Sequence, residues 1–234
     1  MGISHYLAMT AAEIAAAETL PEKLAYMACH FSPYGTGLMA LAQDLPRQAM
    51  LILNDRIPFC GHDHQKIAAQ LAQWVDLLGC GCLLLDFQRQ DTPVELVRFL
   101  CKELSVPVGV AADFAQGLDC PVFLPPVPPD VLPESHIAPW AGREIWLDAA
   151  TEAVTVTVDT RGSHREQSSL ADSQLLPFTH DALCCRYGTK LFSDRAVFTL
   201  QRTSEELPQL LEKAEALGVT AAISLYQEIK KLPV

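Results

Sequence analysis

The chain has 234 residues, half of them apolar, and its 28 acidic side chains outnumber 17 basic ones to give a formal net charge of -11 at pH 7. This charge repels nucleic-acid phosphates and anionic lipid headgroups, so neither nucleic acid nor a membrane surface is an expected partner. No apolar run approaches the roughly 18 residues of a membrane-spanning helix, and no basic segment opens the chain, so we expect a cytoplasmic protein.

The first part of the chain is predicted to alternate strands with helices. Short continuous apolar runs are typical of parallel strands that are buried on both faces. They lie at 5–9, 24–31, 50–53 and 82–87. Thr10 and Glu13 have the spacing of a capping box, which predicts a helix directly after the first of these runs.

Two longer helices follow in the prediction. Asp63 is a suitable N-cap for a helix to Leu78, because the apolar residues between them recur with helical spacing. Thr92 and Glu95 have the spacing of a second cap and predict a helix to about Leu104. Short strands at 106–110 and 120–124 come next.

The second part of the chain is predicted to be poor in helices. Six prolines between Pro125 and Pro139 favour an extended connection that no helix can occupy. Alternating Val and Thr from Val154 to Val158 predict a half-exposed antiparallel strand, with a hairpin turn at Arg161. Its exposed edge would suit a homodimer contact. Further strands are predicted at 144–147, 182–187 and 196–200, then a helix from 203 to 217 and a strand at 219–225.

These elements predict one α/β domain over residues 1–234. It is a (β/α)8-type TIM barrel variant with an irregular, helix-poor second half and an inserted β-hairpin. In such a barrel, ligands bind where the parallel strands end. The polar side chains that follow the predicted strands are therefore the candidate site residues. The candidate catalytic residues are Asp86, Glu228 and Asp55. The candidate substrate-binding residues are Gln88, His30, Tyr34, Asn54, Tyr226 and Gln227.

Eight cysteines are expected to be reduced, because a core-rich chain without an export signal has no need of disulfides. Several lie in apolar runs and are expected to be small core residues, namely Cys29, Cys82, Cys101 and Cys120. Two cysteine pairs are close in the sequence, Cys80 with Cys82 and Cys184 with Cys185. Neither pair has the two-residue gap of a zinc knuckle. We expect no metal and no cofactor.

The order of a short first strand, LAYMACHF, AMLILND, a long helix and CLLLDFQ resembles the first half of the family 18 glycoside hydrolases, the chitinase-like barrels. AAISLYQE near the end resembles the eighth strand of that family. The fourth strand of the family carries the motif D-x-x-D-x-D-x-E. Its acidic positions fall here on Gly81, Leu84, Asp86 and Gln88, so only Asp86 keeps a carboxylate.

The resemblance implies a glycan ligand and a substrate-assisted mechanism. In the family, the last Glu of the motif protonates the glycosidic oxygen, and the Asp two residues before it holds the acetamido group of the substrate. An amide at Gln88 has no proton to give, so Glu228 or Asp55 would have to act as the acid.

Three hypotheses follow. The first is a glycosidase-like barrel that binds or processes an oligosaccharide or another small molecule. The second is a binding or scaffold protein that keeps the barrel without catalysis. The third is a hydrolase that uses His30 with Asp55 and Asp86, with or without a divalent metal. His62 and His64 suggest the same chemistry, although a loop that leads into a helix also explains them.

Overall fold

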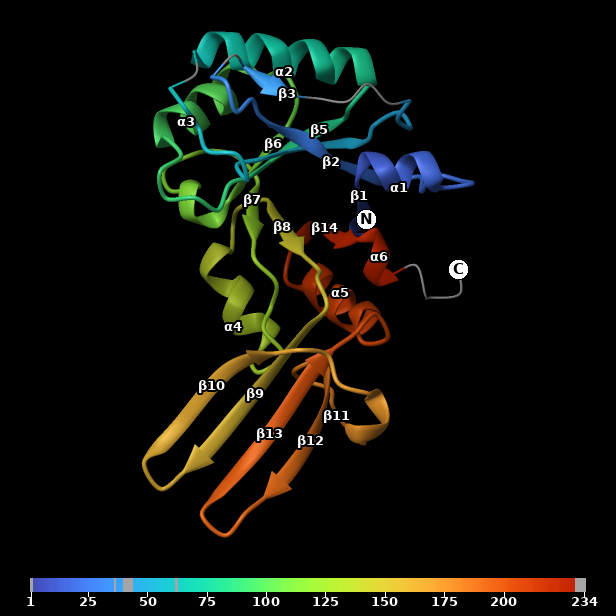
Figure 1. The fold of residues 1–234 in the computed structure, drawn as a ribbon, viewed down its shortest axis with the longest axis vertical. Helices are drawn as coiled ribbons and strands as arrows, with labels where there is room; N and C mark the ends of the chain where they lie inside the picture. Colours follow the sequence, from blue (N-terminus) through green and yellow to red (C-terminus); the bar gives the residue numbers. More distant parts are fainter. Residues whose placement is uncertain (1, 36, 40–43, 62, 230–234) are drawn as a thin grey trace.

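A computed structural model describes residues 2–35, 37–39, 44–61 and 63–229, and eight parallel strands of this part of the chain close into a barrel (Figure 1). In spatial order they are β1 (Ser4–Met9), β2 (Leu24–Phe31), β4 (Met50–Asn54), β5 (Cys82–Asp86), β6 (Val108–Ala111), β7 (Val122–Leu124), β8 (Ile145–Asp148) and β14 (Val219–Leu225). The barrel closes because β1 pairs with both β14 and β2. The predicted fold class is confirmed.

The outer layer is incomplete, as the sequence predicted. Its helices are α1 (Ala11–Ala16), α2 (His64–Leu78), α3 (Val94–Glu103), α4 (Pro133–Ile137), α5 (Leu207–Ala216) and α6 (Tyr226–Ile229). The short strand β3 (Leu38–Met39) follows β2 and pairs with it in antiparallel orientation. Only the 3-10 turn η1 (Ala112–Phe114) follows β6 before the chain enters β7. None of the helices in the described ranges is long and apolar enough to cross a membrane.

Helix α2 shows how the local sequence sets its bounds. The Asp63 carboxylate accepts hydrogen bonds from the backbone amides of Gln65 and Lys66, which otherwise have no partner in the first turn. Gly79 ends the helix with a φ of 64°, a conformation that glycine adopts at little cost. The predicted bounds of this helix are confirmed.

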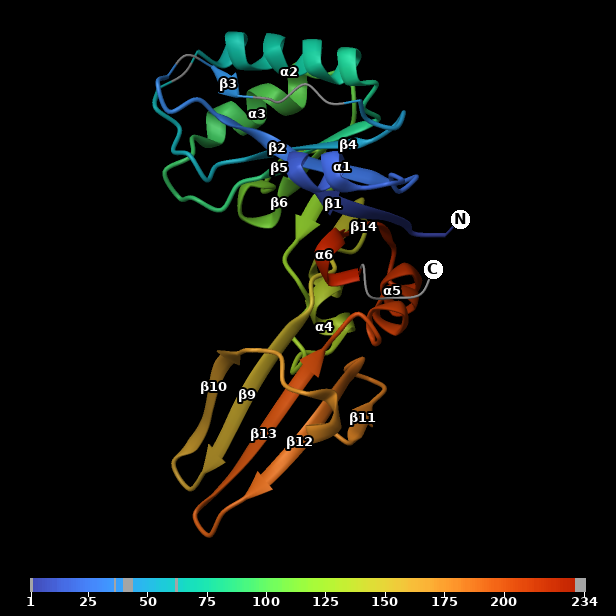
Figure 2. The same ribbon diagram turned by 45° about the vertical axis from the view of Figure 1, so that its right-hand side comes forward.

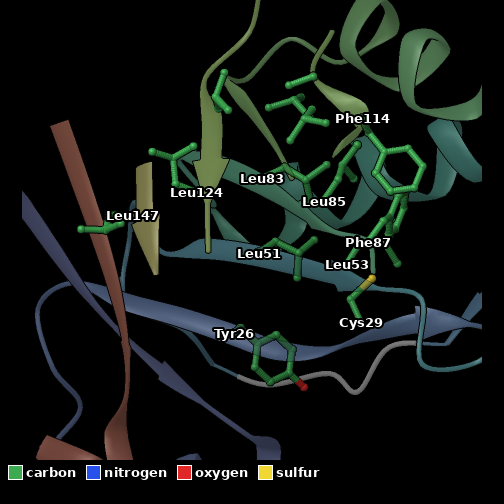
Figure 3. Close-up of a cluster of buried hydrophobic side chains, with 14 of the residues drawn as sticks. Tyr26, Cys29, Leu51, Leu53, Leu83, Leu85, Phe87, Phe114, Leu124 and Leu147 are labelled. Carbon is green, nitrogen blue, oxygen red and sulfur yellow. The ribbon is translucent and has the colours of Figure 1, made fainter. Parts of the chain in front are cut away.

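The main core lies between the barrel and its outer layer (Figure 3). Alternate residues of each strand point outward into it, such as Leu51 and Leu53 of β4 and Leu83 and Leu85 of β5. The residues between them point into the barrel and form a second, smaller core. It includes Tyr6, Ala8, Met50, Ile52, Cys82, Leu84, Phe123, Trp146 and Ile223. The barrel is therefore packed below its carboxyl end.

Trp146 fills the inside of the barrel next to Gly109. A Cβ atom at position 109 would lie 2.2 Å from Cε3 of the indole ring. Trp146 is 3% exposed, and its Nε1 donates a hydrogen bond to Oε1 of Glu144 at 3.0 Å. Close packing of this ring therefore requires glycine on β6.

Gly109→Ala is expected to lower the free energy of unfolding by about 1–3 kcal/mol, because the added methyl group has to displace a buried ring. Urea unfolding of the purified variant measures the loss. In a Trp146→Leu background the same substitution should cost less, since the ring is gone. Equal costs in the two backgrounds would show that the contact with the ring is not the cause.

The connection after β7 departs from the prediction. Helix α4 begins at Pro133, within the segment expected to exclude helices, so that expectation was wrong. Proline is tolerated there because it occupies the first helical turn, where its missing amide hydrogen has no intrahelical partner anyway. A high proline content therefore does not exclude a helix when the proline, like Pro133, lies in the first helical turn.

A five-stranded antiparallel sheet is inserted between β8 and α5 and projects from the barrel (Figures 1 and 2). Its strands, in spatial order, are β10 (Gly162–Ser168), β9 (Glu152–Asp159), β13 (Arg195–Arg202), β12 (Cys185–Leu191) and β11 (Phe178–His180). The predicted hairpin is formed by β9 and β10, as part of this larger sheet. The strand predicted at 182–187 begins later, at Cys185. The homodimer contact stays a prediction.

Arg202 joins the inserted sheet to the barrel. Its side chain is fully buried, and its guanidinium group donates hydrogen bonds to the carbonyl oxygens of Cys184, Leu183 and Val127. Val127 belongs to the segment that leaves β7. Carbonyl oxygens thus satisfy a buried cation, and burial lowers the pKa of Arg202. These hydrogen bonds hold the base of the inserted sheet against the segment that follows β7.

Candidate functional site

Two cavities lie side by side at the carboxyl end of the barrel. The first has a volume of about 180 Å³, and the second has a volume of about 380 Å³. Asp86, Phe123 and Asp148 line both of them. The cavities therefore meet at two carboxylates and one aromatic ring. We refer to the two cavities together as the mouth site.

Asp86 comes from the end of β5, as predicted. It is in register with Asn54 on β4, which is in register with His30 on β2. Asn54 lines the first cavity, and its side chain is fixed by hydrogen bonds with the carbonyl oxygen of Cys29 and the amide of Arg56. The strand ends thus bring polar residues from three neighbouring strands to one level of the barrel.

The predicted site residues did not include Asp148, although it lines both cavities of the mouth site. It follows the apolar residues 145–147 at the end of β8, as Asp86 follows 82–85 at the end of β5. Burial raises the pKa of Asp148 to about 7, and the negative charges of Asp86, Glu228 and Glu152 add to the increase. The criterion that selected Asp86 would have selected Asp148 as well.

The pKa of Asp86 is raised as well. Burial raises the pKa of Asp86, and the charge of Asp55 acts in the same direction. A hydrogen bond from Nε2 of Gln88 to Oδ1 of Asp86, at 3.3 Å, and the charge of Arg56 act in the opposite direction. Gln88 lines the second cavity. Asp86 and Asp148, which line both cavities, thus each have a raised pKa, and the charge of Asp86 contributes to the increase at Asp148.

Asp55 has a different environment. It is 3% exposed, and its carboxylate accepts hydrogen bonds from the backbone amides of Gln88 and Arg89 and from the hydroxyl of Thr92, at 2.8 to 3.1 Å. Both of its oxygens are used to hold the loop between β5 and α3. Asp55, predicted as a candidate catalytic residue, is thus a strand-end carboxylate whose contacts hold a loop.

The predicted cap of α3 was wrong, and the hydrogen bond from Thr92 to Asp55 explains why. We expected Thr92 to cap this helix, but its hydroxyl is turned to Asp55, and the helix begins after Pro93 without a side-chain cap. A carboxylate 37 residues away in the sequence takes the hydroxyl. Local spacing could not reveal that competing partner.

Glu228 lies beside the mouth site rather than on its lining. It is on α6, where Oε2 accepts a hydrogen bond of 2.8 Å from the amide of Thr151, just after β8. Of the other predicted residues, Tyr34 is 84% exposed in the loop after β2. Tyr226 and Gln227 lie on α6, and Tyr226 packs against the main core. Among the described residues, the lining of the two cavities includes Asp86, Gln88 and Asn54 from the predicted set.

The third hypothesis was a hydrolase that uses His30, Asp55 and Asp86. In one version these residues act together with a divalent metal ion. Within the part of the chain that the structure describes, no three His, Cys, Asp or Glu side chains are grouped closely enough to hold a metal ion. His62 lies outside the described residues. His64 is the first residue of α2.

Comparison with solved structures assigns the fold to the class of chitinase-like barrels. A family 18 N-acetylglucosaminidase from Paenibacillus barengoltzii matches with a TM-score of 0.59 over 95% of this chain and 94% of its own, at 10% identity. The spore cortex-lytic enzyme SleL from Bacillus cereus gives a TM-score of 0.60 over 95% and 70% at 8% identity. At these identities the likeness is one of fold.

A third match carries a ligand. It is a class V chitinase from Nicotiana tobaccum, a glutamate-to-glutamine mutant in complex with NAG4, with a TM-score of 0.59 over 96% of this chain and 93% of its own at 9% identity. No family model and no curated protein matches the sequence. The resemblance to family 18 barrels that the sequence suggested is confirmed at the level of architecture.

Proposed function

We propose that the mouth site binds an oligosaccharide that contains N-acetylglucosamine. The observation that carries this proposal is that Asp86, Asp148 and Phe123 line both cavities at the carboxyl end of the barrel. Ligands of barrels with this architecture bind at that end. The second cavity, at about 380 Å³, falls in the size range of small-molecule sites.

The chemistry of the mouth site suits a neutral sugar. Carboxylates accept hydrogen bonds from hydroxyl and amide groups, and the amide of Gln88 can both donate and accept. Phe123 offers an apolar face against which the C–H groups of a sugar ring can lie. Asp86, Asp148 and Asp113 give the lining more acidic than basic groups, which disfavours an anionic ligand.

Calorimetric titration with N-acetylglucosamine oligomers tests binding. We expect millimolar to micromolar affinity for the wild type and at least a tenfold loss in Asp86→Ala, because a hydrogen bond to a charged group is worth about 1.5–3 kcal/mol. Asp91→Ala is the matched control, since Asp91 lies outside both cavities and is paired with Arg89 in solvent. Equal affinity in the two variants would reject Asp86 as a ligand-binding residue.

Hydrolysis of the bound glycan is the second candidate function, and Asp148 favours it. Gln88 stands where the family has its acid and cannot donate a proton. The pKa of Asp148, about 7, leaves a substantial fraction of this carboxyl group protonated at neutral pH. Its proton would pass to the glycosidic oxygen as the bond from that oxygen to the anomeric carbon breaks. Water would supply the hydroxyl group that the anomeric carbon gains, and the remaining proton of that water would return to Asp148.

Turnover of an aryl N-acetylglucosaminide tests this second function. Activity should fall as the pH rises through about 7 and should be lost in Asp148→Asn but kept in Glu228→Gln. Loss in Glu228→Gln with retention in Asp148→Asn would assign the acid to α6 instead. Saturable binding without any turnover would support the binding function and reject hydrolysis.

A further inference from the structure

A further cavity lies at the amino end of the barrel, opposite the mouth site, and has a volume of about 320 Å³. Its lining includes Ser4 at the start of β1, Cys82 at the start of β5 and Glu144 directly before β8. Among the described residues, none lines both this cavity and the mouth site. The small core inside the barrel lies between the two sites. We refer to this hollow as the base cavity.

A positioned carboxylate lies on one side of the base cavity. Oε1 of Glu144 accepts hydrogen bonds from Nε1 of Trp146 at 3.0 Å and from the hydroxyl of Thr220 at 3.4 Å. Both donors are neutral, and Glu144 forms no ion pair within the part of the chain that the structure describes. The protein therefore orients this negative charge without neutralising it.

A cation lies on another side of the base cavity. Lys23 directly precedes β2, and its Nζ lies 5.7 Å from the centre of the Tyr6 ring. The hydroxyl of Tyr6 accepts a hydrogen bond of 3.9 Å from Sγ of Cys82, so the ring has a fixed place in the cavity wall. In the described ranges of the chain, Lys23 has no acidic partner. The base cavity thus contains one unpaired charge of each sign.

The spacing of the two charges sets the kind of ligand that can reach both. In the barrel wall the strands follow one another in the order β2, β1, β14 and β8. Three steps of about 4.8 Å each therefore separate the start of β2 from the start of β8 along the wall. Tyr6, Trp146 and Ala221 line the cavity together with the two charged side chains and are largely apolar. A cation and an anion are thus combined with an apolar surface.

Gln48 adds an independent sign of function to the base cavity. Its φ is 66°, in the left-handed region that residues other than glycine seldom adopt. Its side chain lies over Gly81, where a Cβ atom would be 2.5 Å from Oε1 of Gln48. Strained backbone of this kind is concentrated at functional sites. The strain and the glycine together keep a neutral amide in the lining of the cavity.

We propose that the base cavity binds a small zwitterion of the ω-amino acid class, in which an apolar chain separates an ammonium group from a carboxylate. The carboxylate of the ligand pairs with Lys23, its ammonium group pairs with Glu144, and its methylene groups lie against the rings of Tyr6 and Trp146. An α-amino acid carries both charged groups on one carbon and cannot reach both partners. The volume of the cavity is near the lower end of the range for small-molecule sites. The proposal does not depend on what the mouth site binds.

Nuclear magnetic resonance of the indole N–H groups tests the proposal, because the protein has three tryptophans and Trp146 is the one that lines the base cavity. Trp74→Phe and Trp140→Phe assign the other two signals. Titration with ε-aminocaproate should shift the Trp146 signal saturably, with a Kd in the millimolar range or below. Alanine, hexylamine and hexanoate should each bind at least fivefold more weakly, since each lacks one of the two charges or the chain between them.

Two variants test the charged partners separately. Lys23→Met should weaken ε-aminocaproate binding at least fivefold and leave hexylamine binding unchanged, because hexylamine has no carboxylate. Glu144→Gln should weaken ε-aminocaproate to a similar extent and leave hexanoate binding unchanged. The unchanged affinities also show that the cavity is intact. Lys66→Met is the matched control, since Lys66 is an exposed lysine of α2 outside the cavity, and it should bind like the wild type.

Three results would overturn the proposal. The first is a Trp146 signal that does not move at a high concentration of ε-aminocaproate. The second is equal affinity for ε-aminocaproate, hexylamine and hexanoate, which would show that the two charges are not recognised together. The third is an affinity of Lys23→Met or Glu144→Gln for ε-aminocaproate that equals that of the wild type.

Discussion

Asp148→Asn should make the protein more stable at pH 8 than the wild type, with little difference near pH 4. The wild-type carboxyl group has a pKa of about 7 in the folded protein because it is buried near other acidic groups. In the unfolded chain its pKa is about 3.9. Between these values the folded state binds a proton that the unfolded state releases, so the stability of the wild type decreases as the pH rises from about 4 to about 7.

The size of this effect follows from the difference between the two pKa values. Three pKa units correspond to about 4 kcal/mol at most, and imperfect replacement by the amide reduces this to roughly 2–4 kcal/mol. Thermal unfolding at several pH values measures it, with an expected increase in Tm of roughly 5–10 °C at pH 8. Asp113→Asn is the control for removing a carboxylate from the lining of the mouth site, and because Asp113 is exposed this variant should keep the Tm of the wild type at pH 8. Parallel profiles for the wild type and Asp148→Asn would contradict the account of this carboxyl group.

Asp55→Ala should have the opposite effect on stability and lower the free energy of unfolding at neutral pH. The substitution leaves two backbone amides and the Thr92 hydroxyl without their acceptor in a buried environment. An unsatisfied buried donor costs about 1–3 kcal/mol, so we expect a loss of roughly 3–5 kcal/mol in urea unfolding. Ligand binding should weaken as well, because the same contacts hold Gln88 beside Asp86.

Asp55→Asn and Asp91→Ala are informative comparisons for this prediction. The amide keeps one acceptor oxygen and should recover part of the stability. Asp91 pairs with Arg89 on the surface of the same loop, so its removal should cause no measurable change. Asp55 would not hold this loop if both alanine variants had the stability of the wild type.

The sequence predicted those elements whose signals are local. A single carboxylate at Asp63 and a glycine at Gly79 are enough to begin and end α2, because both act within one helical turn. The barrel strands follow from their continuous apolar runs, and β5 ends at Asp86, one residue before the predicted end at Phe87. The position of Asp86 at the mouth of the barrel then follows from the rule that parallel strands end on the same side.

The remaining features depend on contacts between distant residues. Asp55 and Thr92 each had a plausible local role, and only the fold shows that they bind one another. The closeness of Asp148 to Asp86 depends on the curvature of the sheet, because β8 and β5 are separated by β7 and β6 and still contribute to the same cavities. The size of the inserted sheet was missed for a similar reason. Strands such as β10 are exposed and polar along most of their length, and their pairing defines them better than their apolar pattern does.

The central claim is that a glycan binds at the carboxyl end of this barrel between Asp86 and Asp148. A crystal structure of the protein with N-acetylglucosamine tetramer, soaked well above its measured Kd, tests it most directly. We predict a sugar ring within hydrogen-bond distance of Asp86 and in contact with Phe123, spanning both cavities. Sugar bound elsewhere on the molecule, or an empty mouth site at saturating ligand, would contradict the claim.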